Sequence, residues 1–159
     1  IPIMSEDIYT PLNDTTPFNE LALENQLCFS LYAASKEIIK QYKPLLAPLD
    51  LTYTQYLVML VLWEQGDLSV KELGSHLCLD SGTLTPVLKK LQDKPLLNRI
   101  RDEQDERIVV ISLTTEGKSL KNKAEDSPKK LLALFPLTTT EAATLQMLAV
   151  KLVHGREPK

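Results

Sequence analysis

The chain has 159 residues, of which 43% are hydrophobic and 25% are charged, and this is enough apolar sequence for the core of one domain. It contains no run of 18 apolar residues and no basic stretch followed by an apolar one at its start, which argues against a membrane-spanning helix and a signal peptide. The formal net charge of −3 argues weakly against nucleic acid as a partner. Two cysteines without a secretory signal indicate a protein of the reducing cytoplasm, and their spacing matches no metal motif. We expect neither a metal nor an organic cofactor.

The first 50 residues predict an arm followed by one long helix. Residues 1–20 are rich in proline and polar side chains without periodicity, which indicates a flexible N-terminal arm. From Leu21 onward apolar residues recur at steps of three and four, which predicts a helix that Pro44 and Pro48 bring to an end. A helix of this length in a small domain usually packs on something large, and a partner subunit is one candidate. Residues 21–50 form this helix region.

Two capping boxes predict the next two helices. The first box, Thr52-x-x-Gln55, opens a helix that Gly66 ends, and the second, Ser69-x-x-Glu72, opens a shorter helix. We expect the apolar residues of both helices to face inward: Tyr56, Leu57, Leu60 and Val61 in the first, and Leu73 and Leu77 in the second.

A turn at residues 79–82 separates the short helix from a third one. Asp80, Ser81 or Thr83 can cap this third helix, and Pro86 must lie in its first turn or two, where a missing N–H is tolerated. The third helix is expected to pack through one apolar face: Leu84, Val87, Leu88 and Leu91.

After Pro95 the period of the apolar pattern changes to two, which is typical of strands. Residues 97–101 and 107–113 are predicted to form a β-hairpin around a polar tip at 102–106. A short helix pair followed by a basic hairpin is the plan of a winged helix-turn-helix. The sequence therefore predicts a mainly α protein with a small β-hairpin wing, whose DNA-binding lobe covers residues 51–113.

Two helices are predicted after the hairpin, within residues 114–159. The first helix starts at Thr114 or Thr115 and is expected to bend at Pro128. The second helix is opened by a further capping box, Thr138-x-x-Glu141.

The winged helix-turn-helix plan identifies the residues that are expected to meet DNA. The second helix of the pair enters the major groove and presents its N-terminal side chains to base edges. Basic side chains pair with phosphates, which position the protein, and an arginine at the wing tip can enter the minor groove. The expected residues are Ser81, Gly82, Thr83 and Thr85 at base edges, Lys89, Lys90, Arg99 and Arg101 at phosphates, and Asp105 with Arg107 at the wing tip.

The local charge supports a DNA partner in spite of the net charge. Residues 81–101 carry five basic residues, Lys94 among them, against a single acid, Asp93. Because screening confines electrostatic effects to about 8–10 Å, a local basic patch matters more than the chain total. The alternative is that Lys89 and Lys90 form an ordinary solvated helix face and that the arginines merely protect the edge of the hairpin.

Several stretches resemble a known family. Residues 68–117 resemble the MarR-type regulators through Asp-x-Arg at 105–107 and Ile-Ser-Leu-Thr-x-x-Gly at 111–117. More narrowly, residues 23–125 resemble the organic hydroperoxide resistance regulators, OhrR. The segments that carry this resemblance are 23–29 (Leu-Glu-Asn-Gln-Leu-Cys-Phe), 36–46 (Lys-Glu-Ile-Ile-Lys-Gln-Tyr-Lys-Pro-Leu-Leu), 51–56 (Leu-Thr-Tyr-Thr-Gln-Tyr) and 79–91 (Leu-Asp-Ser-Gly-Thr-Leu-Thr-Pro-Val-Leu-Lys-Lys-Leu).

The resemblance implies a MarR-like homodimer that binds double-stranded operator DNA in its reduced state, represses transcription and is not an enzyme. It also implies that residues 21–50 are a dimerisation helix region and that residues 114–159 form C-terminal dimerisation helices. Its sensing pattern maps onto Cys28 with Tyr32, Tyr42 and Tyr53. Oxidation of the cysteine by an organic hydroperoxide, followed by a disulfide with a low-molecular-weight thiol, is expected to release the DNA. The chain has no cysteine after Cys78, so it resembles the one-cysteine members of the family.

The spacing of these residues carries its own argument. Tyr32 is one helical turn from Cys28 and can touch it, whereas Tyr42 lies fourteen residues on, about 21 Å along one helix at 1.5 Å per residue. Tyr42 therefore reaches Cys28 of the partner subunit only if the two first helices cross antiparallel, and in the family the equivalent tyrosines do come from the other subunit. Thiolate attacks a peroxide, and hydroxyl donors together with a helix N-terminus favour that anion.

The residues also leave other interpretations open. Cys28 lies on an apolar stripe and can be a small core residue, and the same holds for Cys78. A MarR-type repressor that responds to a small aromatic ligand would leave Cys28 silent. A thiol peroxidase would use Cys28 as its nucleophile, but the chain lacks a resolving partner for it.

Overall fold

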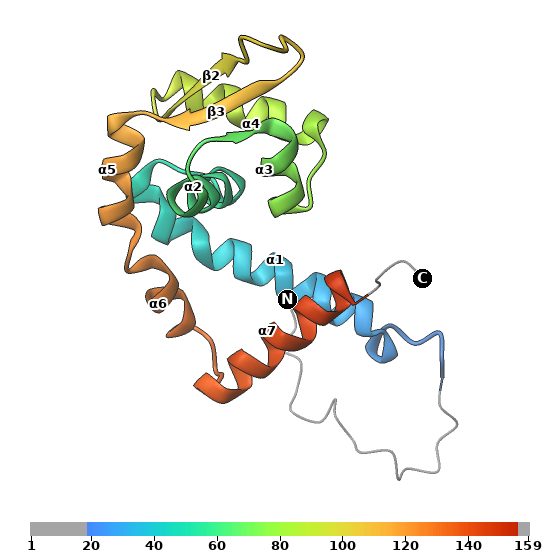
Figure 1. Cartoon of the computed structure of the whole chain (residues 1–159). Helices are drawn as coiled ribbons and strands as arrows, with labels where there is room; N and C mark the ends of the chain where they lie inside the picture. The colour runs from blue at the N-terminus through green and yellow to red at the C-terminus, as the bar shows by residue number, and fades with distance from the viewer. Residues whose placement is uncertain (1–18, 156–159) are drawn as a thin grey trace. The chain divides into compact units, whose positions relative to one another are not determined.

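The computed structural model describes residues 19–155, so the predicted arm lies outside the described residues except for its last two positions. The chain divides into two units after Lys40. Figure 1 labels the helices and strands along the chain. In chain order they are η2 (Leu23–Asn25), α1 (Leu27–Leu46), η3 (Ala47–Leu49), α2 (Tyr53–Gln65), β1 (Leu68–Ser69), α3 (Val70–Leu77), α4 (Ser81–Asp93), β2 (Leu97–Arg101), β3 (Val109–Leu113), α5 (Thr115–Ala124), α6 (Ser127–Leu132) and α7 (Thr139–His154).

Helix α1 starts at Leu27, later than the apolar pattern predicts. The side-chain amide of Gln26 donates to the carbonyl oxygens of Glu20 at 2.6 Å and Ala22 at 3.1 Å, and these bonds hold the preceding residues in tight turns. Pro44 lies inside the last turn of α1 and does not end it. Leu46 is the one fully buried residue of this helix, while Tyr42 and Leu45 are partly buried and Leu27, Tyr32 and Ile39 are exposed in the single chain.

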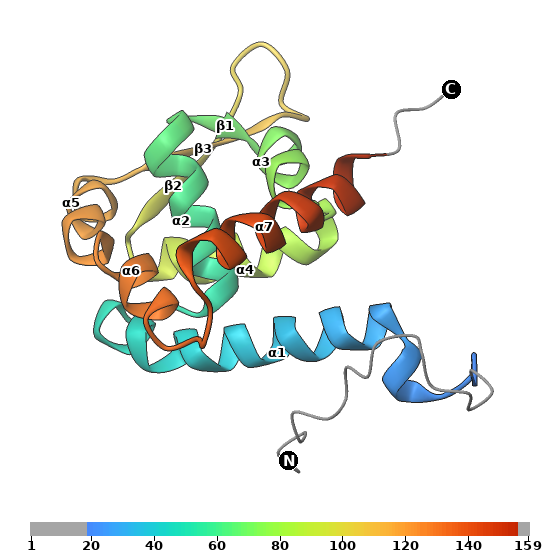
Figure 2. The same cartoon turned by 90° about the horizontal axis from the view of Figure 1, so that it is seen from below.

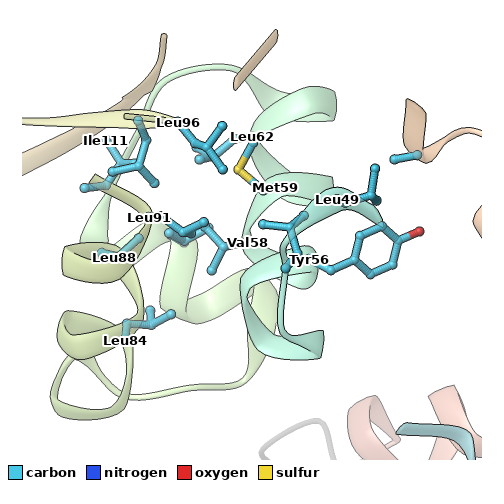
Figure 3. Close-up of a cluster of buried hydrophobic side chains, with 14 of the residues drawn as sticks. Leu49, Tyr56, Val58, Met59, Leu62, Leu84, Leu88, Leu91, Leu96 and Ile111 are labelled. Atoms are coloured by element: carbon cyan, nitrogen blue, oxygen red, sulfur yellow. The ribbon is translucent and has the colours of Figure 1, made fainter. Parts of the chain in front are cut away.

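The core of the second unit lies where α2, α3 and α4 contact one another and the sheet. Figure 3 shows leucines of α4 facing Val58 and Met59 of α2. Tyr56 is buried as predicted, but Leu60 is 38% exposed, so its predicted inward position is wrong. The buried residues of α2 are instead Gln55, Tyr56, Val58, Met59 and Leu62. Apolar side chains surround α2 on several faces, and the packing of α4 decides which of them are buried.

Helix α4 begins at Ser81, so the predicted turn at 79–82 is shorter than expected. Asp80 is the N-cap, and its Oδ1 accepts a hydrogen bond from the backbone N–H of Thr83 at 2.7 Å. Pro86 is the sixth residue of the helix and lies in its second turn, as predicted. The predicted apolar face is confirmed, because Leu84, Leu88 and Leu91 are fully buried and Val87 is partly buried.

The helix-turn-helix is tightly folded at the end of α3. A Cβ on Gly74 would meet the carbonyl oxygen of Leu79 at 2.5 Å, so only glycine allows the turn to approach α3 this closely. Cys78 ends α3 in the left-handed conformation, with φ of 54°. Its side chain is exposed, so the expectation that Cys78 is a core residue is wrong.

The sheet has three antiparallel strands in the order β1-β3-β2, one more than predicted. Strand β1 has only two residues, and Leu68 pairs with Ile111 of β3. Strand β3 starts at Val109 and not at residue 107, because the tip closes through hydrogen bonds between Asp102 N–H and Ile108 carbonyl (2.8 Å) and between Ile108 N–H and Asp105 carbonyl (2.9 Å). The loop that joins β2 and β3 projects beyond the strands as a wing (Figure 2).

The helix predicted to bend at Pro128 is two separate helices. Thr114 caps α5 through a 3.0 Å bond from the Gly117 N–H, while Pro128 is the second residue of α6 and so starts a helix rather than bending one. The predicted capping box at Thr138 opens α7, which buries none of its residues.

Among the residues that the structure describes, no single helix is long and apolar enough to cross a membrane. By length and composition alone, α1 with η3 and α2 together would be sufficient for a membrane span with a bend of 68° between its two parts.

Candidate functional site

The free thiol of Cys28 lies at the N-terminal end of α1. Cys28 is the second residue of the helix and is exposed in the single chain, which does not fit a small core residue. The first turn of α1 holds no acidic residue, and its unpaired backbone N–H groups favour a negative charge. The exposed position makes the Cys28 thiol accessible to a reagent from solution.

Tyr32 follows Cys28 by one turn and is 59% exposed. The ammonium of Lys36 donates to the Tyr32 hydroxyl oxygen at 3.4 Å and lies 5.1 Å from the centre of its ring. The hydroxyl oxygen therefore acts as an acceptor toward Lys36 and keeps its own proton for donation. Lys36 was not among the predicted site residues, although its i,i+4 spacing from Tyr32 was the available signal.

Tyr42 of α1 meets two tyrosines of α2. Its ring centre lies 5.0 Å from that of Tyr53 and 5.5 Å from that of Tyr56, with the ring planes tilted by 38° and 43°. The structure therefore brings two predicted sensing residues together and adds Tyr56, which the sequence analysis assigned only to the core. In Figure 3 the hydroxyl oxygen of Tyr56 points away from the leucine cluster.

The hydroxyl groups of this tyrosine cluster stay protonated. Burial, and then the charges that Tyr56 and Tyr53 would carry, raise the pKa of Tyr42 to about 12. Burial also raises the pKa of Tyr53 and of Tyr56, with Tyr53 adding to the shift of Tyr56. All three groups are therefore hydrogen-bond donors at neutral pH, and none of them is a base.

The two predicted parts of the sensing pattern lie on one unbroken helix. Cys28 and Tyr42 both belong to α1, so fourteen residues of helix separate them, about 21 Å at 1.5 Å per residue. A phenol oxygen reaches only about 6 Å beyond its own Cα, so within one chain Tyr42 does not meet Cys28.

The predicted base-reading residues form an exposed surface at the start of α4. Ser81, Gly82, Thr83 and Thr85 are all exposed, and so are Lys89 and Lys90 further along the helix. The hydroxyl of Thr85 donates to the Ser81 carbonyl at 2.7 Å, which leaves its lone pairs as acceptors. The hydrogen bond from the Thr83 N–H lowers the pKa of the Asp80 carboxyl, so this cap is charged at neutral pH.

The wing tip is held in shape by its own acidic residues. Arg107 donates from Nε and Nη2 to the two carboxylate oxygens of Asp105 at 2.9 and 3.0 Å, and these bonds lower the pKa of Asp105 and raise that of Arg107. Asp102 Oδ1 accepts from the N–H groups of Gln104 and Asp105. The Arg107 side chain is still 90% exposed, so its guanidinium is presented to solvent in one orientation.

The remaining basic residues of the predicted patch behave differently from one another. Arg101 is exposed on β2, whereas Arg99 is half-buried and its Nε has no hydrogen-bond partner within the described part of the chain. Strand β2 is an edge strand, so protection of the edge remains a second role for both arginines. Lys94, which the charge count placed in the patch, binds Asp50 and Gln55 instead.

Between residues 19 and 155 no three His, Cys, Asp or Glu side chains lie close enough together to hold a metal ion.

Comparison with known proteins places this arrangement among transcription regulators. A family model described as the transcriptional regulator SarA/Rot matches residues 40–124. The chain is 56% identical over 117 residues to the organic hydroperoxide resistance transcriptional regulator of Bacillus subtilis (strain 168), which covers 74% of this chain and 80% of that protein.

Solved structures show the same fold bound to DNA. Reduced AbfR bound to DNA, a protein of Staphylococcus epidermidis, is 34% identical, with a TM-score of 0.70 over 84% of this chain and 94% of that one. Overoxidised AbfR bound to DNA gives the same identity and TM-score. A mutant MarR from Escherichia coli complexed with operator DNA is 27% identical, with a TM-score of 0.69 over 79% of this chain and 92% of that one.

Proposed function

The chain belongs to the MarR-type winged-helix transcription regulators, with the SarA/Rot proteins and the organic hydroperoxide resistance regulators, and we propose that it is a repressor controlled by oxidation of Cys28. The reduced homodimer binds operator DNA through α4 and the wing. An organic hydroperoxide oxidises Cys28, and the dimer then releases the operator. The observation that carries this proposal is the contact between Tyr42 and Tyr53, whose hydroxyl groups are both protonated donors. The same chain carries an exposed thiol, Cys28, at the start of α1.

The DNA contacts follow from the exposed first turn of α4. Small hydroxyl side chains at Ser81, Thr83 and Thr85 are suited to base edges in the major groove. Lys89, Lys90, Arg99 and Arg101 are assigned to phosphates, and the Arg107–Asp105 pair presents a guanidinium to the minor groove. The DNA-bound structures of AbfR and MarR support this use of the fold.

The sensing contacts are assigned across the dimer. Leu27, Tyr32 and Ile39 of α1 and much of the apolar surface of α7 are exposed in the single chain, which suits helices that are covered by a second copy. When two α1 helices cross antiparallel, Tyr42 and Tyr53 of one subunit come to Cys28 of the partner subunit. Their hydroxyl groups then donate to the sulfur and stabilise its thiolate.

The reaction uses one molecule of hydroperoxide. The thiolate sulfur of Cys28 attacks the terminal peroxide oxygen, an S–O bond forms and the O–O bond breaks. The leaving alkoxide takes a proton and departs as an alcohol, which leaves a sulfenic acid on Cys28. A low-molecular-weight thiol then attacks this sulfur, so that an S–S bond forms and water leaves.

The test is operator binding before and after one equivalent of an organic hydroperoxide. We expect the oxidised wild type to lose affinity, and we expect Cys28→Ser to bind with near-normal affinity and ignore the oxidant, since serine retains a similar volume but is not oxidised. Cys78→Ser is the matched control and should respond like the wild type. Release of Cys28→Ser by hydroperoxide contradicts the proposal, as does continuous peroxide turnover, which would indicate a thiol peroxidase.

A further inference from the structure

Lys94 is the C-cap of the recognition helix α4, and its ammonium group binds Asp50 and Gln55, whereas Lys89 and Lys90 are exposed. Its Nζ donates to the backbone carbonyl of Asp50 and, at 3.2 Å, to the side-chain oxygen of Gln55. The Asp50 carboxylate oxygen Oδ2 lies 3.3 Å from Nζ and is the third acceptor. An ammonium has three N–H donors, and here three acceptors meet them. Only 29% of the Lys94 side chain is exposed.

The acceptors of Lys94 lie on either side of a sensing residue. Asp50 follows η3 in the left-handed conformation, with φ of 51°. Gln55 is 3% exposed and belongs to the capping box of α2, where its side-chain oxygen also accepts from the Thr52 N–H at 3.1 Å. Tyr53, the first residue of α2, lies between them in sequence and contacts the ring of Tyr42.

Directional bonds to Lys94 differ from the other contacts of α4. Leu84, Leu88 and Leu91 hold the helix through apolar packing, which has no preferred direction and allows small shifts. The bonds of Lys94 join the C-terminal end of α4 to Asp50 and to the buried Gln55, so a shift of the first turn of α2 changes the contacts of Lys94. The end of α4 therefore follows the first turn of α2 more closely than leucine packing alone requires.

We propose that Lys94 is a positioning residue that couples the tyrosine-bearing first turn of α2 to the recognition helix α4. The proposal rests on the redox function given above and extends it inside the subunit. When Tyr42 and Tyr53 change their contacts on oxidation, the first turn of α2 shifts, and the bonds of Gln55 and Asp50 to Lys94 carry this shift to α4.

The first test compares operator affinity in the reduced and oxidised states for three variants. Lys94→Met keeps the aliphatic stem and removes the donors, so the ratio of oxidised to reduced Kd should fall at least about fivefold, the lower end of typical coupling between sites. Lys94→Arg keeps a charged donor and should retain most of the ratio. Gln55→Glu keeps the capping box and adds a charged acceptor, so it should retain or increase the ratio. The rate of Cys28 oxidation should be the same in all three.

The second test needs no oxidant and separates the two proposals. Operator affinity is measured for Tyr53→Ala, Lys94→Met and the double variant, with Lys94→Arg as the control for correct folding. We expect Tyr53→Ala to weaken binding and the double variant to be no weaker than the single ones, because the coupled path is already broken. Additive losses, or no loss in Tyr53→Ala, overturn the role of Lys94. The wild type can also fail to release the operator on oxidation while the losses of Tyr53→Ala and Lys94→Met remain non-additive. In that case the proposed redox function is wrong and the coupling of Tyr53 to Lys94 is supported.

Discussion

Tyr42 is a hydrogen-bond donor over the whole physiological pH range because burial raises its pKa to about 12. The other two members of the cluster are shifted in the same direction. A donor that keeps its proton stabilises a thiolate by hydrogen bonding and does not compete with it for charge. This property makes the hydroxyl group, rather than the ring, the part of Tyr42 to test.

The Tyr42 pKa predicts a loss of stability in alkali. The phenol loses its proton near pH 10 in the unfolded chain and near pH 12 in the folded one, so its contribution is complete below pH 10 and is lost as the pH rises through 12. Tyr42→Phe should therefore lose less stability between pH 9 and 11.5 than the wild type, as measured by urea unfolding. Equal losses in both proteins would show that Tyr42 is not the titrating group.

The same variant should also slow sensing. Tyr42→Phe keeps the ring contacts with Tyr53 and Tyr56 but removes the hydroxyl that is proposed to donate to the sulfur of Cys28. We expect slower oxidation by an organic hydroperoxide, on the order of tenfold for one lost charge-assisted bond, with unchanged reduced-state operator affinity. Stopped-flow kinetics with Tyr56→Phe as the neighbouring control measure the effect.

Cys28 should form a mixed disulfide and not a bond to Cys78. Cys78 is the C-cap of α3 and Cys28 is the second residue of α1, so the two thiols belong to different elements, and a disulfide between them forms only if their Cα atoms come within about 7 Å. With a low-molecular-weight thiol present, mass spectrometry should find that thiol on Cys28. Without it, continued peroxide should give sulfinic and sulfonic acids. A Cys28–Cys78 disulfide as the main product would contradict a one-cysteine mechanism.

The wing and α4 should contribute differently to DNA binding. Arg107 is fixed by Asp105 on an exposed tip, so Arg107→Ala should weaken operator binding on the order of tenfold without unfolding the lobe. Lys89→Ala should weaken binding evenly across DNA sequences. It should also lower the slope of log affinity against log salt concentration by about one, the effect of one lost phosphate contact. Fluorescence anisotropy at several salt concentrations distinguishes the two effects.

The control for these variants is Lys118→Ala on α5, which removes an exposed charge outside the predicted lobe and should leave binding unchanged. Normal binding by Arg107→Ala at physiological salt would show that the wing does not contact DNA.

The proposed sensing site is complete only when two subunits contribute to it. One unbroken α1 separates Tyr42 from Cys28 of the same chain by about 21 Å, so in the proposed sensing site the Tyr42 hydroxyl has to come from the partner subunit. A heterodimer of Cys28→Ser and Tyr42→Phe subunits therefore contains one intact site, made of Cys28 from the second subunit and Tyr42 from the first.

We expect this heterodimer to oxidise its single Cys28 at the wild-type rate, while the Tyr42→Phe homodimer remains slow. Tagged subunits purified as a mixed dimer and followed by mass spectrometry give this rate. A heterodimer as slow as the Tyr42→Phe homodimer would show that each tyrosine serves its own chain.

Much of this protein is readable from neighbouring residues alone. The capping boxes at Thr52, Ser69 and Thr138 all form, because each needs only hydrogen bonds between residues three apart. The apolar face of α4 and the strand Leu97–Arg101 also appear as their periods predict. These local choices agree with one another, and together they specify the winged helix-turn-helix.

The remaining features depend on contacts between residues distant in sequence. Leu60 lies at the surface while Met59 is buried, because α2 carries apolar side chains on several faces and its contacts with α3, α4 and α5 decide which of them are covered. Strand β1 exists only through pairing with β3, about 40 residues further on. Lys94 contributes to a basic stretch in the sequence, yet in the folded chain its charge meets Asp50 and Gln55, 44 and 39 residues away. A local sequence pattern predicts which side chains each helix or strand presents. Which of these side chains contact one another depends on how the elements pack in the folded chain.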